Sequence, residues 1–369
     1  MIRNLLRKTP WYKKELQQEG RYLHKIFSLR ITKILLIAVI VVFVLLLTIY
    51  LLFKPTVQHD INYGVTFSSK YATELGLDWQ ETYLAILDDL NTENIRLVAY
   101  WDEIERERGV YDYSDVEWQL EKAEERNLNV ILALGRKVPR YPECFEPAWW
   151  KLIQDEELQN QGLYEYVKQT VTTLRGFESI KIWQVENEPF WPFGECPDNL
   201  NAQTVATEIK IVRNIDKRPI LVQDSGEGGL WYKTYKLGDF LGISMYRKIW
   251  YNFWGVFFGR HVYFQYPLAN WTYSVKAGIV RIPYDKIVVT ELQAEPWGPG
   301  LNSELSEEEK NRTMSRNDFY ATLDYAQKAG FRDLYLWGVE WWYWEKYENG
   351  NPFFWDTAKV LFARPQLDL

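Results

Sequence analysis

Two acidic residues follow two apolar runs that have the length and composition of buried strands. The first run, residues 180–185, leads into Glu186, Asn187, Glu188 and Pro189, and the second, residues 287–290, leads into Glu291. A pair of carboxyl groups in one pocket is the reacting machinery of glycoside hydrolysis, in which one protonates the departing oxygen and the other attacks or activates water. Glu188 and Glu291 are therefore the candidate catalytic residues.

The elements that must position this pair follow a regular alternation from residue 60 onward. Strand-length apolar runs cover residues 61–68, 95–101, 129–135, 180–186, 219–224, 240–246, 286–291 and 333–339, and helical periodicity covers 79–90, 115–126, 163–174, 204–214 and 317–328. Such alternation is typical of βα units around a parallel sheet. Eight units in roughly 310 residues without a linker predict an α/β fold, a single (β/α)8 barrel over residues 61–369.

Local signals support two helix ends. Ser114 and Glu117 have the spacing of a capping box, which predicts that Ser114 caps a helix N-terminus. Gly330 follows the last helical segment at the place where a glycine commonly ends a helix.

Catalytic and binding groups of such barrels lie at the C-terminal ends of the strands. Strand ends give the candidate substrate-binding residues Arg96, Trp101, Arg136, Asn187, Tyr246 and Trp337, and the loop after Glu291 adds Glu295 and Trp297. Aromatic rings stack on the C–H faces of sugars, while charged groups fix the hydroxyls. The mixture therefore indicates a carbohydrate pocket, and Glu295, four residues after Glu291, is an alternative nucleophile.

These residues resemble those of the clan A retaining glycoside hydrolases, a group that includes the cellulase-like family 5, β-galactosidases and xylanases. The resemblance rests on Asn187, Glu188 and Pro189 after the fourth strand, Glu291 after the seventh, Arg96 on the second, Tyr246 on the sixth and Trp337 on the eighth. It implies double displacement with Glu188 as acid/base, Glu291 as nucleophile and Asn187 bound to the sugar 2-hydroxyl. No strand end carries a histidine, unlike many members of families 5 and 10, so the exact family and the sugar stay open.

The N-terminal segment differs in kind from the rest. Residues 34–53 are uncharged and apolar over about 20 positions, enough to cross a bilayer. Lys54, Pro55 and Thr56 follow instead of a small-residue cleavage site, which predicts an uncleaved signal anchor. Residues 1–33 carry nine Lys and Arg against two Glu, so the positive-inside rule places this basic tail in the cytoplasm. A linker of residues 54–60 would then lead to a barrel on the outer face of the cell membrane.

Charge narrows the choice of partners. The net charge is −7 and the basic tail contributes +7, which leaves −14 for residues 34–369. A strongly acidic domain does not attract nucleic acid. The predicted partners are a carbohydrate substrate and, through residues 34–53, the lipid bilayer.

The two cysteines, Cys144 and Cys196, lie in loops of the predicted barrel, where an oxidising compartment permits a disulfide between them. With two cysteines and three histidines in the chain, we predict no metal site. The proposed chemistry requires no cofactor.

The sequence thus predicts a membrane-anchored retaining glycosidase that acts on an extracytoplasmic, β-linked glycan. Two alternatives remain: a tethered carbohydrate-binding barrel with little or no turnover, and a transglycosylase that passes the glycosyl unit to another sugar. An aromatic segment at residues 249–258 is interpreted as a lid or a packed helix, ahead of a face that dips into the bilayer. The sugar, the linkage, endo or exo cleavage and the oligomeric state are not specified.

Overall fold

The computed structural model describes residues 10–196, 200–251 and 262–363. The chain divides into two units between Lys54 and Pro55. The first contains one helix, α2 (Pro10–Phe53), and its stretch Arg30–Phe53 has a mean hydropathy of 3.3. In the part of the chain that the structure describes, this is the one helix long and apolar enough to cross a membrane.

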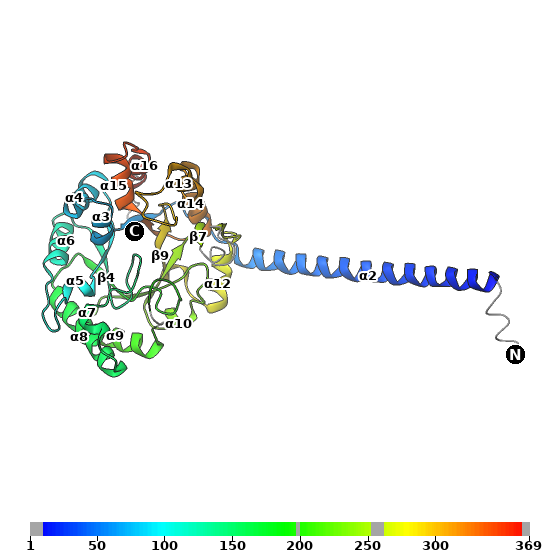
Figure 1. The fold of residues 1–369 in the computed structure, drawn as a ribbon, viewed down its shortest axis with the longest axis horizontal. Helices are drawn as coiled ribbons and strands as arrows, with labels where there is room; N and C mark the ends of the chain where they lie inside the picture. The colour runs from blue at the N-terminus through cyan, green and yellow to red at the C-terminus, as the bar shows by residue number, and fades with distance from the viewer. Residues whose placement is uncertain (1–9, 197–199, 252–261, 364–369) are drawn as a thin grey trace. The chain divides into compact units, whose positions relative to one another are not determined.

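The second unit is a closed barrel of eight parallel strands (Figure 1). The strands are β1 (Asn62–Thr66), β2 (Asn94–Val98), β3 (Asn129–Leu134), β4 (Ile180–Val185), β5 (Ile220–Asp224), β6 (Phe240–Met245), β9 (Ile287–Gln293) and β10 (Asp333–Trp337). Their order around the barrel follows the chain and closes by pairing β10 with β1. All eight predicted strands and the (β/α)8 fold are confirmed.

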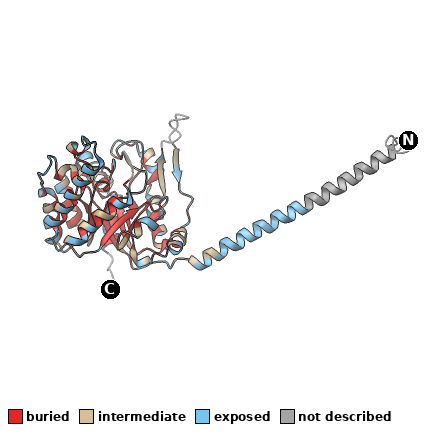
Figure 2. Ribbon diagram, turned by 90° about the horizontal axis from the view of Figure 1, so that it is seen from below, coloured by how far each residue is buried: buried red, intermediate tan, exposed pale blue. Residues whose placement is uncertain are grey.

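Helices surround the barrel, and Figure 2 shows buried residues concentrated in the strands and on the inner helix faces. They are α3 (Ser69–Glu74), α4 (Trp79–Asp89), α5 (Trp101–Ile104), α6 (Ser114–Glu124), α7 (Ala148–Lys151), α8 (Glu156–Leu174), α9 (Ala202–Ile215), α10 (Tyr232–Tyr235), α12 (Thr272–Val280), α13 (Glu307–Thr313), α14 (Arg316–Ala329), α15 (Val339–Tyr347) and α16 (Phe353–Phe362), with a 3₁₀ turn at Tyr284–Lys286. Each of the five predicted helices is present. Helix α8 begins seven residues before the predicted segment because Asp155 caps it by accepting from Leu158 N.

One of the two predicted helix ends is wrong. Ser114 is the first residue of α6 rather than its cap, and the preceding Tyr113 makes no side-chain cap bond. Asp112 instead accepts a hydrogen bond from Ser114 N at 3.0 Å. Gly330 does end α14, with a left-handed φ of 89° that favours glycine.

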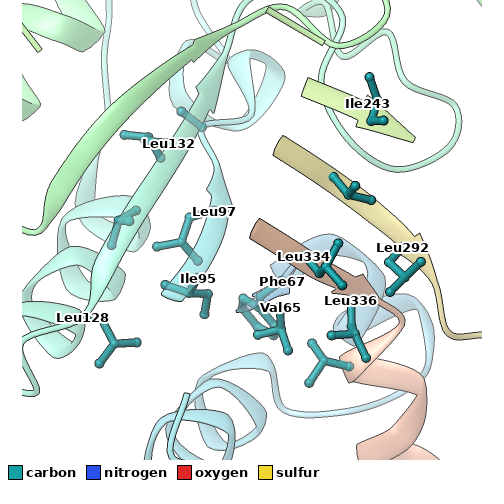
Figure 3. Close-up of a cluster of buried hydrophobic side chains, with 14 of the residues drawn as sticks. Val65, Phe67, Ile95, Leu97, Leu128, Leu132, Ile243, Leu292, Leu334 and Leu336 are labelled. Atoms are coloured by element: carbon teal, nitrogen blue, oxygen red, sulfur yellow. The ribbon is translucent and has the colours of Figure 1, made fainter. Parts of the chain in front are cut away.

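Successive strand residues point to opposite faces, and this alternation separates two environments. One set packs against the helices, and Figure 3 shows side chains of this layer from several strands, among them Val65, Ile95, Leu132 and Leu334. The other set fills the barrel interior with an apolar layer of Ile131, Leu221, Val288 and Tyr335. Nearer the C-terminal ends of the strands the interior is polar and contains Thr66, Arg96, Gln184, Gln223 and Thr290, all fully buried. The site is built on this polar layer.

After β6, the strand β7 (Lys248–Tyr251) pairs antiparallel with β8 (Val262–Gln265). The predicted aromatic segment 249–258 therefore begins as a strand and not as a helix. Its remainder, residues 252–258, lies outside the described residues.

Candidate active site

The end of β4 presents two neighbouring side chains at the barrel mouth, the end of the barrel where the C-terminal ends of the strands lie. Strand alternation alone would direct Asn187 and Glu188 to opposite sides. Glu186 and Glu188 have positive φ values of 63° and 46°, so the chain turns sharply here. As a result Asn187 accepts a hydrogen bond from Arg96 Nη2 at 2.8 Å, while Glu188 Oε1 accepts one from Ser244 Oγ at 2.9 Å.

In β9 a bulge lets two consecutive side chains, those of Thr290 and Glu291, both face the barrel interior. Its pairing with β6 passes from Val289 directly to Glu291, so Thr290 is an extra residue in the ladder. A bulge of this kind changes the direction in which following side chains point. Thr290 Oγ1 can thus donate to Gln223 inside the barrel while Glu291 also faces the interior.

Arg96 connects the two strand ends. It is fully buried and donates to Gln184 at 2.8 Å, Gln223 at 2.7 Å, Asn187 at 2.8 Å and Glu291 at 3.1 Å. A guanidinium has a fixed, planar set of donors, so this one side chain orients four partners from three other strands.

Glu291 is surrounded by donors. Its Oε1 accepts from Arg96 Nη1 and from Gln223 Nε2 at 2.8 Å, and its Oε2 accepts from Tyr246 OH at 3.2 Å. A buried cation and two neutral donors stabilise the ionised carboxylate.

Glu188 has the opposite environment. It is buried, and Ser244 is the one side-chain donor shown for its carboxyl group. Burial raises the pKa of Glu188 well above its usual range, and the negative charges of Glu143 and Glu291 raise it further, while Lys137 and Ser244 act in the other direction. The protonated form is therefore favoured here.

The segment after β3 approaches both groups. Residues 136–145, which we call the β3 hairpin, fold back through a Lys137–Cys144 bridge, a Val138 N to Glu143 O bond and a Glu143 N to Arg140 O bond. Cys144 forms a disulfide with Cys196, with Cα atoms 5.4 Å apart. Lys137 O also accepts from Asn187 N at 2.7 Å, so the hairpin is held against the loop that carries Glu188.

Arg140 extends from this hairpin to the loops after β9 and β10. It lies between the rings of Tyr71 and Trp337, 3.8 and 4.1 Å from their centroids, and it donates to Glu295 and, at 2.6 Å, to Glu340. Burial raises the pKa of Glu295 to about 7 even though Arg140 opposes the shift. Glu295 is thus paired with Arg140, and the Arg140 guanidinium covers one face of the Trp337 ring.

Behind the hairpin lies a second pair of carboxyl groups. Glu186 accepts from the backbone N–H groups of Arg136 and Lys137, both at 2.7 Å. It also interacts with Glu208 of α9, and burial together with the charge of Glu186 raises the pKa of Glu208 well above its usual range. Gly135, with φ of 129°, leaves the space that the Glu186 carboxylate occupies, because a Cβ there would collide with it. Through its two backbone hydrogen bonds, Glu186 fixes the start of the β3 hairpin.

Two candidate residues are placed away from the carboxyl pair. Trp101 is fully buried and stacks on Tyr166, with centroids 5.1 Å apart, while its Nε1 donates to Glu105. Its ring has no face left for a sugar, so the prediction that it binds substrate is wrong. Arg136 Nε donates to Glu146 at 2.7 Å, and its guanidinium packs over Trp150, so it is a structural ion pair.

The remaining candidates converge on the mouth. Arg96, Asn187, Tyr246 and Glu291 form one hydrogen-bonded network, and Glu188 bonds to Ser244, the β6 residue paired with Glu291. Trp297 packs edge-on against Tyr246 with centroids 5.0 Å apart. Sequence reasoning missed Lys137, Arg140, Glu143, Gln223 and Ser244 as members of the site. Arg140 and Glu143 lie on either side of Pro142, and Glu143 precedes Cys144. The proline-containing loop at a strand end and its cysteine were the signals in the sequence that could have indicated these two residues.

Within the described ranges, no group of three or more His, Cys, Asp or Glu side chains is arranged to hold a metal ion.

No family model and no curated protein sequence matches this chain. Solved structures do: an exo-beta-1,4-mannosidase from Opitutaceae bacterium strain TAV5 has a TM-score of 0.52 at 16% identity over 75% of this chain. A xylanase 10B from Thermotoga petrophila RKU-1, in complex with xylobiose, has a TM-score of 0.52 at 16% identity over 82% of this chain and 94% of its own. The chain shares the (β/α)8 barrel fold of these glycoside-cleaving enzymes.

A further structure with this barrel fold is GH5_18 from Streptomyces cattleya in complex with GlcNAc, with a TM-score of 0.50 at 15% identity over 75% of this chain and 70% of its own. This chain spans about half of the mannosidase, 51% of its length. At these identities the likeness establishes the fold, and the assignment of an activity rests on the residues of the site.

Proposed function

We propose that the barrel is a retaining glycoside hydrolase. The observation that carries this proposal is the contrast between two buried carboxyl groups at neighbouring positions of the mouth: Glu291 accepts from a guanidinium, an amide and a phenol, whereas Glu188 has its pKa raised by burial and by two other carboxylates. Double displacement requires one carboxylate and one carboxylic acid in the same pocket.

Each residue then has a defined part in the reaction. Glu291 attacks the anomeric carbon while Glu188 donates its proton to the departing oxygen, which leaves a glycosyl ester on Glu291. Esterification removes the negative charge of Glu291, so Glu188 loses one of the charges that kept it protonated and takes a proton from the incoming water. The water attacks the anomeric carbon, and Glu291 leaves as a carboxylate.

Asn187 is held in place for substrate binding. Its Oδ1 accepts from Arg96, which directs the amide and leaves Nδ2 without a hydrogen-bond partner. A 2-hydroxyl oxygen can accept from this Nδ2, and such a contact strengthens as the transition state forms. Arg140, Glu295, Trp297 and Trp337 contribute the outer wall of the proposed sugar site.

The location follows from the N-terminal helix. We propose that Arg30–Phe53 is a signal anchor, with the basic tail in the cytoplasm and the barrel outside. The substrate is then an extracytoplasmic glycan, and the name of the exo-beta-1,4-mannosidase with this fold supports a β-linked one. The Cys144–Cys196 disulfide agrees with an oxidising compartment.

A transglycosylase would use the same two carboxyl groups with a sugar in place of water. A tethered carbohydrate-binding protein would need the aromatic residues but not the paired acids, so the arrangement around Glu188 and Glu291 argues against it.

The test is covalent trapping. Full-length protein in detergent is incubated with 2-deoxy-2-fluoro glycosides that carry activated leaving groups, and intact mass and peptide mapping follow. We expect a glycosyl adduct on Glu291. An adduct on Glu295 would keep the reaction class and move the nucleophile, whereas sugar binding without any adduct would favour the tethered binding protein. Adding acceptor sugars and measuring the transferred product separates hydrolysis from transglycosylation.

A further inference from the structure

Several buried polar atoms at the barrel mouth have no hydrogen-bond partner. Among the described residues these include Arg140 Nε, Glu143 Oε2, Asn187 Nδ2 and Glu295 Oε2. Leaving such a group unsatisfied destabilises the folded state, and native proteins contain few such groups. The two nitrogen atoms are donors and the two oxygen atoms are acceptors, and they come from the loops after β3, β4 and β9. Such a set matches a ligand whose hydroxyl groups both donate and accept.

Glu143 is the member of this set for which the proposed mechanism has no use. Its side chain is 8% exposed, and Lys137 Nζ lies 3.0 Å from its Oε2. That ammonium also donates to the carbonyl oxygens of Glu188 and Trp191, each at 3.0 Å. Its ion pair with Glu143 balances the carboxylate charge at one oxygen, and a carboxylate that can accept about four hydrogen bonds keeps acceptor capacity for a ligand hydroxyl.

The backbone holds Glu143 in this position. Its φ is 71°, a left-handed conformation that is uncommon for a residue with a side chain and is found mainly where the surroundings impose it. Gly194 lies against it, since a Cβ on Gly194 would be 2.6 Å from Pro142 O and 3.1 Å from Glu143 Cβ. The adjacent Cys144 is fixed by its disulfide. The carboxyl group is therefore held in advance rather than free to reorient toward other donors.

The charge of Glu143 acts on both reacting carboxyl groups. It raises the pKa of Glu188, and the charge of Glu291 contributes to raising the pKa of Glu143 itself, which burial brings to about 7. The geometry agrees, because the Lys137 ammonium that lies 3.0 Å from Glu143 Oε2 also donates to the carbonyl oxygen of Glu188, so Glu143 lies next to the loop that carries Glu188.

We propose that Glu143 is a substrate-binding residue that accepts a hydrogen bond from a hydroxyl group of the reacting sugar; this inference rests on the proposed glycosidase function. Because Lys137 already balances the carboxylate, the matching donor is a neutral hydroxyl and not the ammonium of an amino sugar. Arg140, three residues away on the same hairpin, presents its unpaired Nε to the same ligand.

The experiment compares Glu143→Ala and Glu143→Gln with the matched control Glu195→Gln, an exposed glutamate in the loop that faces the hairpin. A sugar that the full-length protein binds or hydrolyses is tested together with its monodeoxy analogues, each lacking one hydroxyl. Binding is measured by calorimetry on the Glu188→Gln background, so the readout does not depend on turnover. Thermal unfolding confirms that each variant is folded.

We expect the parent protein to bind one monodeoxy analogue about ten- to a hundredfold more weakly than the complete sugar, as for a hydrogen bond to a charged group. Glu143→Ala should weaken binding of the complete sugar by a similar factor and bind that analogue no more weakly than the complete sugar. Glu195→Gln should stay within twofold of the parent for every ligand.

Other outcomes overturn the inference. Binding by Glu143→Ala within twofold of the parent would exclude the contact, and an equal loss for all analogues would show a structural role alone. If binding depends on Glu143 as expected but the unmutated protein hydrolyses no glycoside, the inference stands and the proposed hydrolase function fails. If neither variant nor parent binds a neutral sugar, Glu143 does not have this role.

Discussion

The ends of β4 and β9 carry the same side chain in opposite surroundings. At β9, Glu291 accepts hydrogen bonds from Arg96, Gln223 and Tyr246. At β4, Glu188 has a hydroxyl group as its side-chain donor and is raised in pKa by burial and neighbouring carboxylates. The role of a glutamate in this barrel is therefore set by the side chains that the adjacent strands place around it.

The largest effects are expected from removing each carboxyl group. Glu291→Ala should lower kcat/KM by at least about 10⁴-fold for every substrate, because no nucleophile remains. Glu188→Ala should lower it by about 10²- to 10⁴-fold for glycosides with poor leaving groups. With a dinitrophenyl leaving group, which needs no protonation, Glu188→Ala should retain the first step and accumulate glycosyl-enzyme.

Steady-state and burst kinetics on the two substrate types measure this asymmetry. Equal losses on both substrates for Glu188→Ala would contradict its role as the acid. Added azide should restore turnover of Glu188→Ala by attacking the glycosyl-enzyme, whereas in Glu291→Ala it should give a product of inverted configuration.

The next effect concerns the cation that supports Glu291. Arg96→Met removes one partner of a fully buried ion pair, and we expect the free energy of unfolding to fall by about 3–5 kcal/mol. The double variant Arg96→Met, Glu291→Gln should recover part of this loss because no buried carboxylate is left unpaired. Urea unfolding measures both, and a single variant as stable as the parent would show that the pair contributes nothing to stability.

A smaller loss is expected at the β3 hairpin. Replacing Cys144 and Cys196 by serine opens a link between positions 52 residues apart, and a loop of this length corresponds to about 2–4 kcal/mol of stability. Because the hairpin carries Lys137 and Glu143, KM should also rise. These are the two cysteines of the chain, so reduced parent protein should unfold at the same denaturant concentration as the serine variant.

The smallest effect is a displacement of the pH profile. Catalysis needs protonated Glu188, so the rate falls as pH rises through the elevated pKa of Glu188. Glu143→Gln removes one of the charges that raise this pKa, and the fall should begin at lower pH. The kcat/KM profile of Glu195→Gln serves as the control and should match the parent. An unmoved alkaline limb in Glu143→Gln would show that Glu143 does not act on Glu188.

The fold was predictable because its signals are local. Each strand is buried on both faces, so it appears as a short apolar run, and the eight predicted runs match the strands to within a few residues. The incorrect capping box at Ser114 shows the limit of spacing rules, since Asp112, two residues earlier, takes the backbone hydrogen bond.

The site was predictable where residues stand at strand ends and not where loops cross the mouth. Glu188, Glu291, Arg96 and Tyr246 follow directly from the strand pattern. Glu143 reaches the site only because the hairpin folds back and is joined to Cys196, a contact across 52 residues that no local periodicity encodes. The prediction that Trp101 binds substrate was wrong for a related reason: helix α5 starts at this residue, and its ring lies in the core.

Because of the buried carboxyl groups at the mouth, the folded barrel binds more protons than the unfolded chain at mildly acidic pH. Burial raises the pKa of Glu143 and Glu295 to about 7 from an ordinary value of 4.5. Between these two pH values the folded chain binds more protons than the unfolded chain, so their contribution to stability is complete below pH 4.5 and is lost as pH rises toward 7. Folding therefore takes up protons and unfolding releases them, and at mildly acidic pH the measured heat of unfolding will include the ionisation heat of the buffer that receives them.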